Sequence, residues 1–164
     1  MNSSQPCVFG EVLFDCFPDG SRVLGGAPFN VAWHLQAFGQ APRMISRVGD
    51  DDLGRQILSA MSDWGMDTGQ LQVDETLPTG QVTVTLVDDE PQYEIVRPAA
   101  WDAIEALSTT PPCGLLYHGS LAARDRKSAA ALQDLVDAAP RRVFVDVNLR
   151  PPWWQAETVL AQMS

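Results

Sequence analysis

Polar groups of three kinds stand close together near the start of the chain and could hold a small ligand between them. Asp15 ends an apolar stretch, the pair Gly25 and Gly26 comes ten residues later, and Asn30 follows after four more. Adjacent glycines lack the Cβ atoms that would keep a ligand away from the backbone. A carboxylate at the end of a strand in an open α/β sheet lies where such sheets bind ligands, and it can accept two hydroxyl groups at once. These residues predict a site for a small polar ligand.

The elements that must position these groups follow a strand, helix, strand order. Residues 8–17 predict a central strand whose far end enters the binding site. Pro28 favours the first turn of a helix and Gly39 ends it. The predicted buried stripe of this helix has helical spacing and consists of Val31, Leu35 and Phe38. Residues 44–48 predict the next strand, which completes a right-handed β-α-β unit.

The rest of the chain predicts more α/β structure, interrupted by one antiparallel hairpin. A second helix follows Asp50-Asp51-Asp52, and we interpret these acids as a helix cap rather than as a metal cluster. Alternating residues between positions 81 and 97 predict a hairpin with one solvent-exposed face. The α/β pattern then returns, with a strand at 115–117, a helix at 126–139 and a buried strand at 143–147.

The glycine-rich segment carries a family resemblance. The spacing Gly-Gly-x-x-x-Asn-x-Ala over residues 25–32, followed by Gly39 and Gly49, resembles the first signature of the ribokinase-type (PfkB) carbohydrate kinases. Residues 97–102 and 146–150 resemble segments of the fructokinase branch. The resemblance implies an α/β, ribokinase-like fold with a mostly parallel central sheet flanked by helices. It also implies a small antiparallel β lid, formed by strands around residues 22–24 and 79–97.

The resemblance assigns substrate-binding roles to seven residues. Those expected to hold or border the sugar and the site of phosphate transfer are Asp15, Gly25, Gly26, Asn30, Arg97, Asn148 and Arg150. Other interpretations remain open for three acidic or basic groups. Asp15 is alternatively a solvated turn residue, Arg97 an exposed charge that protects a sheet edge, and Asp146 a carboxylate that holds its own loop.

The resemblance covers only about the first half of a family member. The family's Gly-Ala-Gly-Asp motif, which supplies the catalytic base, and its Asn-x-x-Glu motif for magnesium do not occur in this sequence. We therefore expect residues 1–164 to be the N-terminal, sugar-binding portion of a kinase, without the nucleotide-binding half. The resemblance implies ATP and Mg²⁺ for the complete enzyme, none bound by this chain alone, and phosphoryl transfer to a primary hydroxyl of a fructose-like sugar.

Two other functions remain as alternatives. The chain could be a non-catalytic sugar-binding module that forms a homodimer through the edges of its β lid. It could also be a generic nucleotide-binding domain, because a glycine loop that opens a helix can bind phosphate. Ala27 and Phe29 argue against this last function, since they offer neither a lysine nor a hydroxyl group.

Composition narrows the partners and the location that we expect. The 21 acidic residues exceed the 11 basic ones and give a net charge of −10, which would repel nucleic acid and anionic membrane surfaces. The three cysteines have no C-x-x-C spacing and favour a reducing compartment. No apolar run approaches the roughly 20 residues of a membrane span, and the first residues lack the pattern of a signal peptide. We expect a cytoplasmic protein with a small-molecule ligand.

Overall fold

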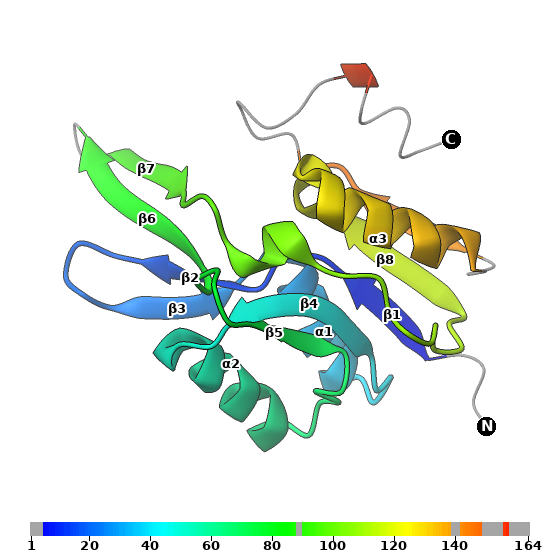
Figure 1. The fold of residues 1–164 in the computed structure, drawn as a ribbon. Coiled ribbons are helices and arrows are strands. Elements are labelled where there is room, and N and C mark those ends of the chain that lie inside the picture. Colours follow the sequence, from blue (N-terminus) through cyan, green and yellow to red (C-terminus); the bar gives the residue numbers. More distant parts are fainter. Residues whose placement is uncertain (1–4, 88–89, 139–141, 149–155, 158–164) are drawn as a thin grey trace.

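Two β sheets with different strand directions organise the protein (Figure 1). The computed structural model describes residues 5–87, 90–138, 142–148 and 156–157. In these residues the larger, central sheet has the strand order β5-β4-β1-β8-β9, and each neighbouring pair is parallel. Its strands are β1 (Pro6–Phe9), β4 (Arg43–Gly49), β5 (Leu71–Asp74), β8 (Leu115–Gly119) and β9 (Val143–Asp146). The predicted mostly parallel sheet is confirmed.

The second sheet, which we call the small sheet, has the order β3-β2-β6-β7 and projects from the side of the central sheet (Figure 1). Its strands are β2 (Leu13–Cys16), β3 (Arg22–Gly25), β6 (Gly80–Val87) and β7 (Glu90–Ile95). The β2–β3 and β6–β7 pairs are antiparallel, and β2 runs parallel to β6. Val82 and Val84 are buried while Thr83 and Thr85 are exposed, so the predicted alternation is confirmed in β6. It is wrong for β7, where the residues before Ile95 are all exposed.

Helices cover both faces of the central sheet. The helices are α1 (Ala27–Ala37), α2 (Asp52–Asp63) and α3 (Arg126–Asp137), and two short 3-10 turns are η1 (Ala100–Ala103) and η2 (Leu121–Arg124). Successive side chains of a strand point to opposite faces. Accordingly, Cys7 and Phe9 of β1 pack in the core cluster that contains α3, whereas Val8 packs in the cluster that contains α1 and α2. The helices flanking a parallel sheet are those expected from the sequence.

The cap of α2 confirms one prediction in atomic detail. The Asp51 side chain accepts a hydrogen bond from the Gly54 N–H at 2.8 Å and further bonds from the backbone and hydroxyl of Thr79. Asp51 thus satisfies a free N–H group at the helix start and also ties the helix to the segment before β6.

Among the described residues, no helix has the length and apolar character that a membrane crossing requires.

The prediction of a single strand over residues 8–17 is wrong. The chain leaves the central sheet after Phe9 and enters the small sheet at Leu13, so the segment forms β1 and β2. The break falls at Gly10, whose φ of 151° is rarely adopted by other residues. A Cβ atom at Gly10 would stand 2.4 Å from the Pro28 ring, so the tight contact with the start of α1 also requires glycine.

Two burial predictions are also wrong. In α1 the buried residues are Pro28, Phe29 and Ala32, while Phe38 is 77% exposed beyond the last turn. The helix therefore faces the sheet with its first turns, and Val31 and Leu35 lie at the side of the contact. Strand β9 was expected to be buried, but Val143 and Phe144 are 41% and 57% exposed. In the described residues β9 is an edge strand that pairs only with β8.

Candidate functional site

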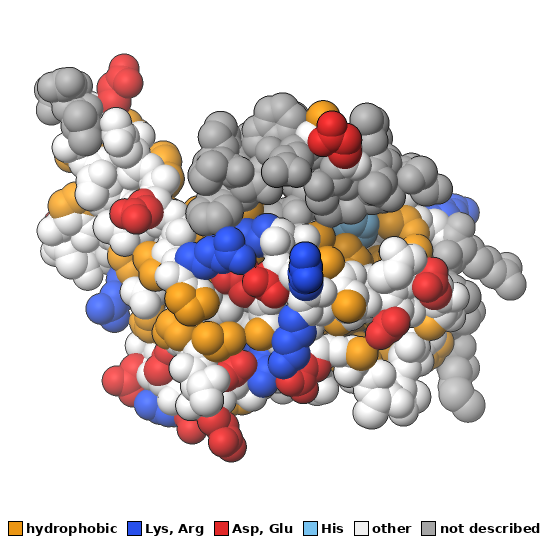
Figure 2. Space-filling view, turned by 45° about the horizontal axis from the view of Figure 1, so that its top comes forward, with side chains coloured by type: hydrophobic (Ala, Val, Ile, Leu, Met, Phe, Trp, Pro, Cys, Tyr) orange, Lys and Arg blue, Asp and Glu red, His pale blue; other side chains and the backbone are white. Residues whose placement is uncertain are grey.

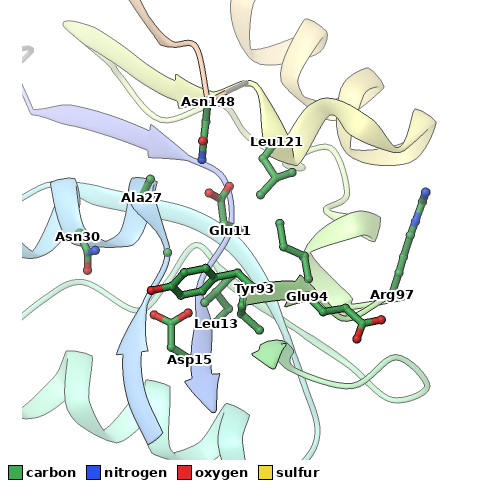
Figure 3. Close-up of a pocket in the computed structure, with 13 residues that line it drawn as sticks. Glu11, Leu13, Asp15, Ala27, Asn30, Tyr93, Glu94, Arg97, Leu121 and Asn148 are labelled. Atoms are coloured by element: carbon green, nitrogen blue, oxygen red, sulfur yellow. The ribbon is translucent and has the colours of Figure 1, made fainter. Parts of the chain in front are cut away.

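A cavity of about 780 Å³ lies between the small sheet and the carboxyl ends of β1, β8 and β9 (Figure 3). Its lining brings together segments that are far apart in the sequence. The lining residues are Glu11, Leu13, Asp15, Gly26, Ala27, Asn30, Val82, Tyr93, Glu94, Ile95, Arg97, Leu121 and Asn148. Open α/β sheets bind ligands at the carboxyl ends of their strands, so the cavity is where this fold would hold one.

The lining contains five of the seven residues that the sequence assigned to the site. They are Asp15, Gly26, Asn30, Arg97 and Asn148. Gly25 adjoins the cavity rather than lining it: it pairs with Leu13 across the small sheet, and a Cβ atom on it would stand 3.4 Å from the Asp15 carboxylate. Arg150 lies outside the described residues.

Asp15 reaches the cavity from a different element than the sequence suggested. It lies in β2 of the small sheet, between Val23 of β3 and Val82 of β6, and is partly buried. It is therefore not at the carboxyl end of a central strand. Figure 3 shows its carboxylate below the position of Glu11, on the small-sheet side of the cavity. The strand pairing on both sides holds the Asp15 backbone in place.

Gly26 and Asn30 belong to the start of α1. Gly26 is the residue before the first helical turn, with φ 107° and ψ 129°, and its carbonyl oxygen accepts a hydrogen bond from the Asn30 N–H at 2.8 Å. A Cβ atom on Gly26 would stand 2.6 Å from the Glu11 carbonyl oxygen. The close approach of these two backbone segments thus depends on the missing side chain. Asn30 is exposed in the first turn.

Figure 3 shows Arg97 across the cavity from α1, whereas Asn148 comes from the segment after β9, and both residues are held by other groups. The Arg97 guanidinium pairs with the carboxylate of Asp125 at 3.1 Å, and each side chain is 39% exposed. The Asn148 backbone N–H donates to the Ser120 hydroxyl at 3.1 Å, which in turn donates to the Asn148 carbonyl oxygen at 3.3 Å. These bonds hold the segment after β9 against the segment after β8.

Asp146 ends β9 and is tied to the neighbouring strand. The Tyr117 hydroxyl of β8 donates to the Asp146 carboxylate at 2.6 Å. Burial of the phenol and this hydrogen bond to a carboxylate both raise the pKa of Tyr117. The contact crosses from one parallel strand to the next, so Asp146 is held within the sheet immediately before the chain reaches Asn148.

Glu11 is the residue of the cavity that sequence reasoning missed as a site. It lies in the bend between β1 and β2, is only 2% exposed, and its Oε2 atom has no hydrogen-bond partner among the described residues. Burial raises its pKa to about 7, while backbone hydrogen bonding and the Arg124 charge oppose the shift. The sequence feature that could have identified Glu11 is an acidic residue directly after Gly10 within an apolar run. Ending the first strand at that glycine would have put Glu11 at its carboxyl end.

The charges around the cavity are mixed, with acids in excess. Glu11, Asp15 and Glu94 supply carboxyl groups, and Arg97 supplies a guanidinium. On the face shown in Figure 2 acidic and basic side chains are interspersed. A cavity with more acids than bases is suited to a ligand that donates hydrogen bonds and carries no negative charge.

The central parallel sheet, the small sheet beside it and the polar cavity between them define an α/β protein with a ribokinase-like fold. Residues 11–164 match the family described as "pfkB family carbohydrate kinase". The chain belongs to this carbohydrate kinase family, as the glycine-rich signature indicated.

Individual relatives agree with this assignment. A fructokinase of Salmonella typhimurium is 30% identical over 165 residues, which are 93% of this chain and 53% of that protein. The apo crystal structure of fructokinase from Vibrio cholerae O395 superimposes with a TM-score of 0.82 at 26% identity, over 98% of this chain and 60% of that one. Another structure of the Vibrio cholerae enzyme contains fructose, ADP and a calcium ion, and matches with a TM-score of 0.76 at 24% identity, over 98% of this chain and 57% of that one. The chain spans about half the length of the curated relatives it matches.

Proposed function

We propose that this chain is the sugar-binding half of an ATP-dependent sugar kinase of the fructokinase type. In this proposal, residues 1–164 are the N-terminal portion of the kinase domain, and the small sheet is the lid over the sugar. The complete enzyme transfers a phosphoryl group to a primary hydroxyl of a fructose-like sugar. One observation carries the proposal: five residues assigned from the sequence, on four separate segments of the chain, line one cavity.

The proposed roles follow from the chemistry of each group. Asp15 accepts hydrogen bonds from two sugar hydroxyls, and the Asn30 amide both donates and accepts. Gly26 lets the sugar come close to the backbone at the start of α1. Arg97 and Asn148 line the cavity and border the site where the sugar and the phosphoryl group would meet. Together these groups orient the sugar, while the small sheet excludes water from it.

A metal ion would find no cluster of acidic, His or Cys ligands within the described residues. These residues contain no cluster of three His, Cys, Asp or Glu side chains that could hold a metal ion. In our proposal ATP and Mg²⁺ are bound by the nucleotide-binding half of the enzyme, where they supply the phosphoryl group. Support comes from the relative that contains ADP and a calcium ion beside fructose. The three free cysteines favour a reducing compartment, and we propose the cytoplasm.

Calorimetric titration of the 164-residue chain with fructose tests the proposal. We expect saturable binding that is lost in Asp15→Ala and retained in Asp63→Ala, which removes an exposed acid at the end of α2. A separate titration with ATP and Mg²⁺ should give no heat of binding. Tight nucleotide binding, or fructose binding that survives Asp15→Ala, would contradict the proposal.

A specific observation also favours a role in self-association. The small sheet carries exposed apolar side chains on three strands, Val23 (54%), Leu86 (63%) and Tyr93 (55%), and its outer strands β3 and β7 leave backbone groups to pair. We propose a homodimer formed through this sheet.

Light scattering after gel filtration should give twice the chain mass, and Leu86→Lys should give a monomer. Val73→Lys changes an exposed valine of the central sheet and should leave the dimer intact. A wild-type monomer would refute the proposal.

A further inference from the structure

Glu11 has the properties of a ligand-binding group that lacks its ligand. Its side chain is 2% exposed, it lines the cavity, and its Oε2 atom has no hydrogen-bond partner in the part of the chain that the structure describes. Figure 3 shows its carboxyl group rising into the space between Leu121 and Asn148. Buried polar atoms are nearly always paired in folded proteins, so an unpaired carboxyl oxygen facing a cavity calls for a partner there.

The Glu11 backbone is fixed independently of the carboxyl group. The bend after Gly10 and the contact of the Glu11 carbonyl with Gly26 place this residue between the central sheet and the start of α1. The Glu11 carboxyl group also lies beside β8, because a Cβ atom on Gly119 of that strand would stand 3.8 Å from Glu11 Oε2. The glycine leaves open space beside this oxygen. A ligand in the cavity therefore meets a preorganised acceptor rather than a mobile side chain.

Charged and titratable groups on three neighbouring elements face Glu11. Arg124 of η2 attracts a negative charge on Glu11, although this guanidinium already forms a two-bond pair with Asp102 at 2.7 and 3.0 Å. Asp146 at the end of β9 repels such a charge, and Tyr117 of β8 lies within electrostatic reach. Burial outweighs the attraction of Arg124 and raises the pKa of Glu11 to about 7. The neutral and ionised forms are therefore close in free energy near neutral pH.

We propose that the Glu11 carboxylate is a further substrate-contacting group, which accepts a hydrogen bond from a hydroxyl of the bound sugar through Oε2. The inference rests on the proposed function and deepens it by adding a second acidic acceptor to Asp15. A hydroxyl is the matching partner because it donates without adding charge, and hydrogen bonds to an ionised acceptor are roughly twice as strong as neutral ones.

Sugar binding should consequently depend on pH in a defined direction. A hydrogen bond to the ionised form favours that form, so binding releases a proton from Glu11 wherever the acid is neutral in the free protein. Affinity rises as the pH rises through about 7 and becomes constant above it. For binding to the ionised form alone and a pKa of about 7, the affinity increases about thirtyfold between about pH 5.5 and 8.5.

The test compares fructose titrations over this pH range for the wild-type chain, Glu11→Gln and Glu75→Gln. Glu11→Gln preserves the size of the side chain but cannot ionise, and we expect flat, weak binding, about tenfold below wild type at the highest pH. Glu75→Gln makes the same change at an exposed acid outside the cavity and should behave as wild type. Flat wild-type binding, or a pH dependence retained in Glu11→Gln, would overturn the inference.

A second measurement does not depend on the variant being folded. Carbon-13 NMR of the labelled Glu11 carboxyl in the wild-type chain should show its pKa falling when fructose is added. An unchanged or increased pKa with fructose bound would overturn the Glu11 contact while leaving the proposed function in place. No fructose binding to the wild-type chain at any pH would overturn the proposed function and, with it, this contact.

Discussion

Gly26→Ala tests whether the start of α1 is built around the absence of a side chain. Gly26 has φ 107° and ψ 129°, a conformation that costs other residues on the order of 1–3 kcal/mol. In addition, the new Cβ atom would stand 2.6 Å from the Glu11 carbonyl oxygen and 3.3 Å from Val12 Cα, both backbone atoms that cannot rotate away. Overpacking of this kind costs about 1–3 kcal/mol more. We expect a total loss of about 2–6 kcal/mol, a large part of a typical domain's stability.

The matched control is Gly39→Ala. Gly39 also has a positive φ, 70°, but nothing lies within 4 Å of its hypothetical Cβ atom. The Gly39→Ala variant should lose only the stability that the strained backbone conformation costs an alanine, about 1 kcal/mol. Urea unfolding followed by circular dichroism gives both values. Equal losses in the two variants would refute the claim that Gly26 packs against the Glu11 backbone, because that contact should add to the loss at Gly26 beyond any difference in backbone strain.

Three further predictions concern other parts of the fold. Asp74 is held by Arg47 at 2.9 Å and by hydrogen bonds from Thr76 and Leu77, which overcome its burial and lower its pKa from 3.8 to about 2. Because the pKa of Asp74 is lower in the folded state, its ionised form contributes about 2 kcal/mol to stability above about pH 4, and this contribution disappears as the pH falls toward 2. The stabilities of wild type and Asp74→Asn should therefore converge when unfolding is measured at acid pH. Asp51→Ala should lower the free energy of unfolding in urea by about 1–3 kcal/mol, because the hydrogen bonds to Gly54 and Thr79 are lost. The control Asp52→Ala removes only an exposed ion pair with Arg55 and should lower it by less than about 1 kcal/mol. Hydrogen bonding with Cys7 is the main cause that lowers the pKa of the Cys113 thiol to about 7. At neutral pH iodoacetamide should therefore modify Cys113 before Cys7, as followed by mass spectrometry. Preferential labelling of Cys7 would contradict this.

Local signals account for the parts of the fold that were predictable. The Gly26 to Pro28 segment marks the start of α1, and the Asp51 cap with apolar residues at helical spacing marks α2. Each signal is contained within one or two turns of chain, where glycine, proline and capping residues act directly on the backbone. The parallel order of β1 and β4 then follows from the helical connection, which carries the chain back to the other end of the sheet before the next strand begins.

Features that depend on distant contacts were not predictable from the sequence. The apolar run over residues 8–17 continues across the break at Gly10, and the one local sign of the break is the acid Glu11 directly after that glycine. In the part of the chain that the structure describes, strand β5 is short and pairs only with β4, and Val73 within it is 47% exposed. The exposure of β9 likewise reflects its position at the sheet edge rather than its composition.

Several residues that line the cavity were named from the sequence, but Glu11 was not among them, and the geometry was not foreseen. The family signature indicated Asp15, Gly26 and Asn30, and all three line the cavity. The sequence did not reveal that Asp15 reaches it from the small sheet, since that requires the pairing of β2 with the distant strand β6, in which Asp15 lies opposite Val82. Gly25 is a neighbour of the site because its pairing with Leu13 keeps it within β3.

In our proposal fructose binds between the small sheet and the start of α1, and hydrogen exchange tests this location most directly. Exchange of backbone amides is measured by mass spectrometry with and without fructose. We predict slower exchange in residues 11–16 and 26–31 on addition of fructose, with no change in α3. Protection confined to α3 or to the outer edge of the central sheet, or no protection at saturating fructose, would contradict the account.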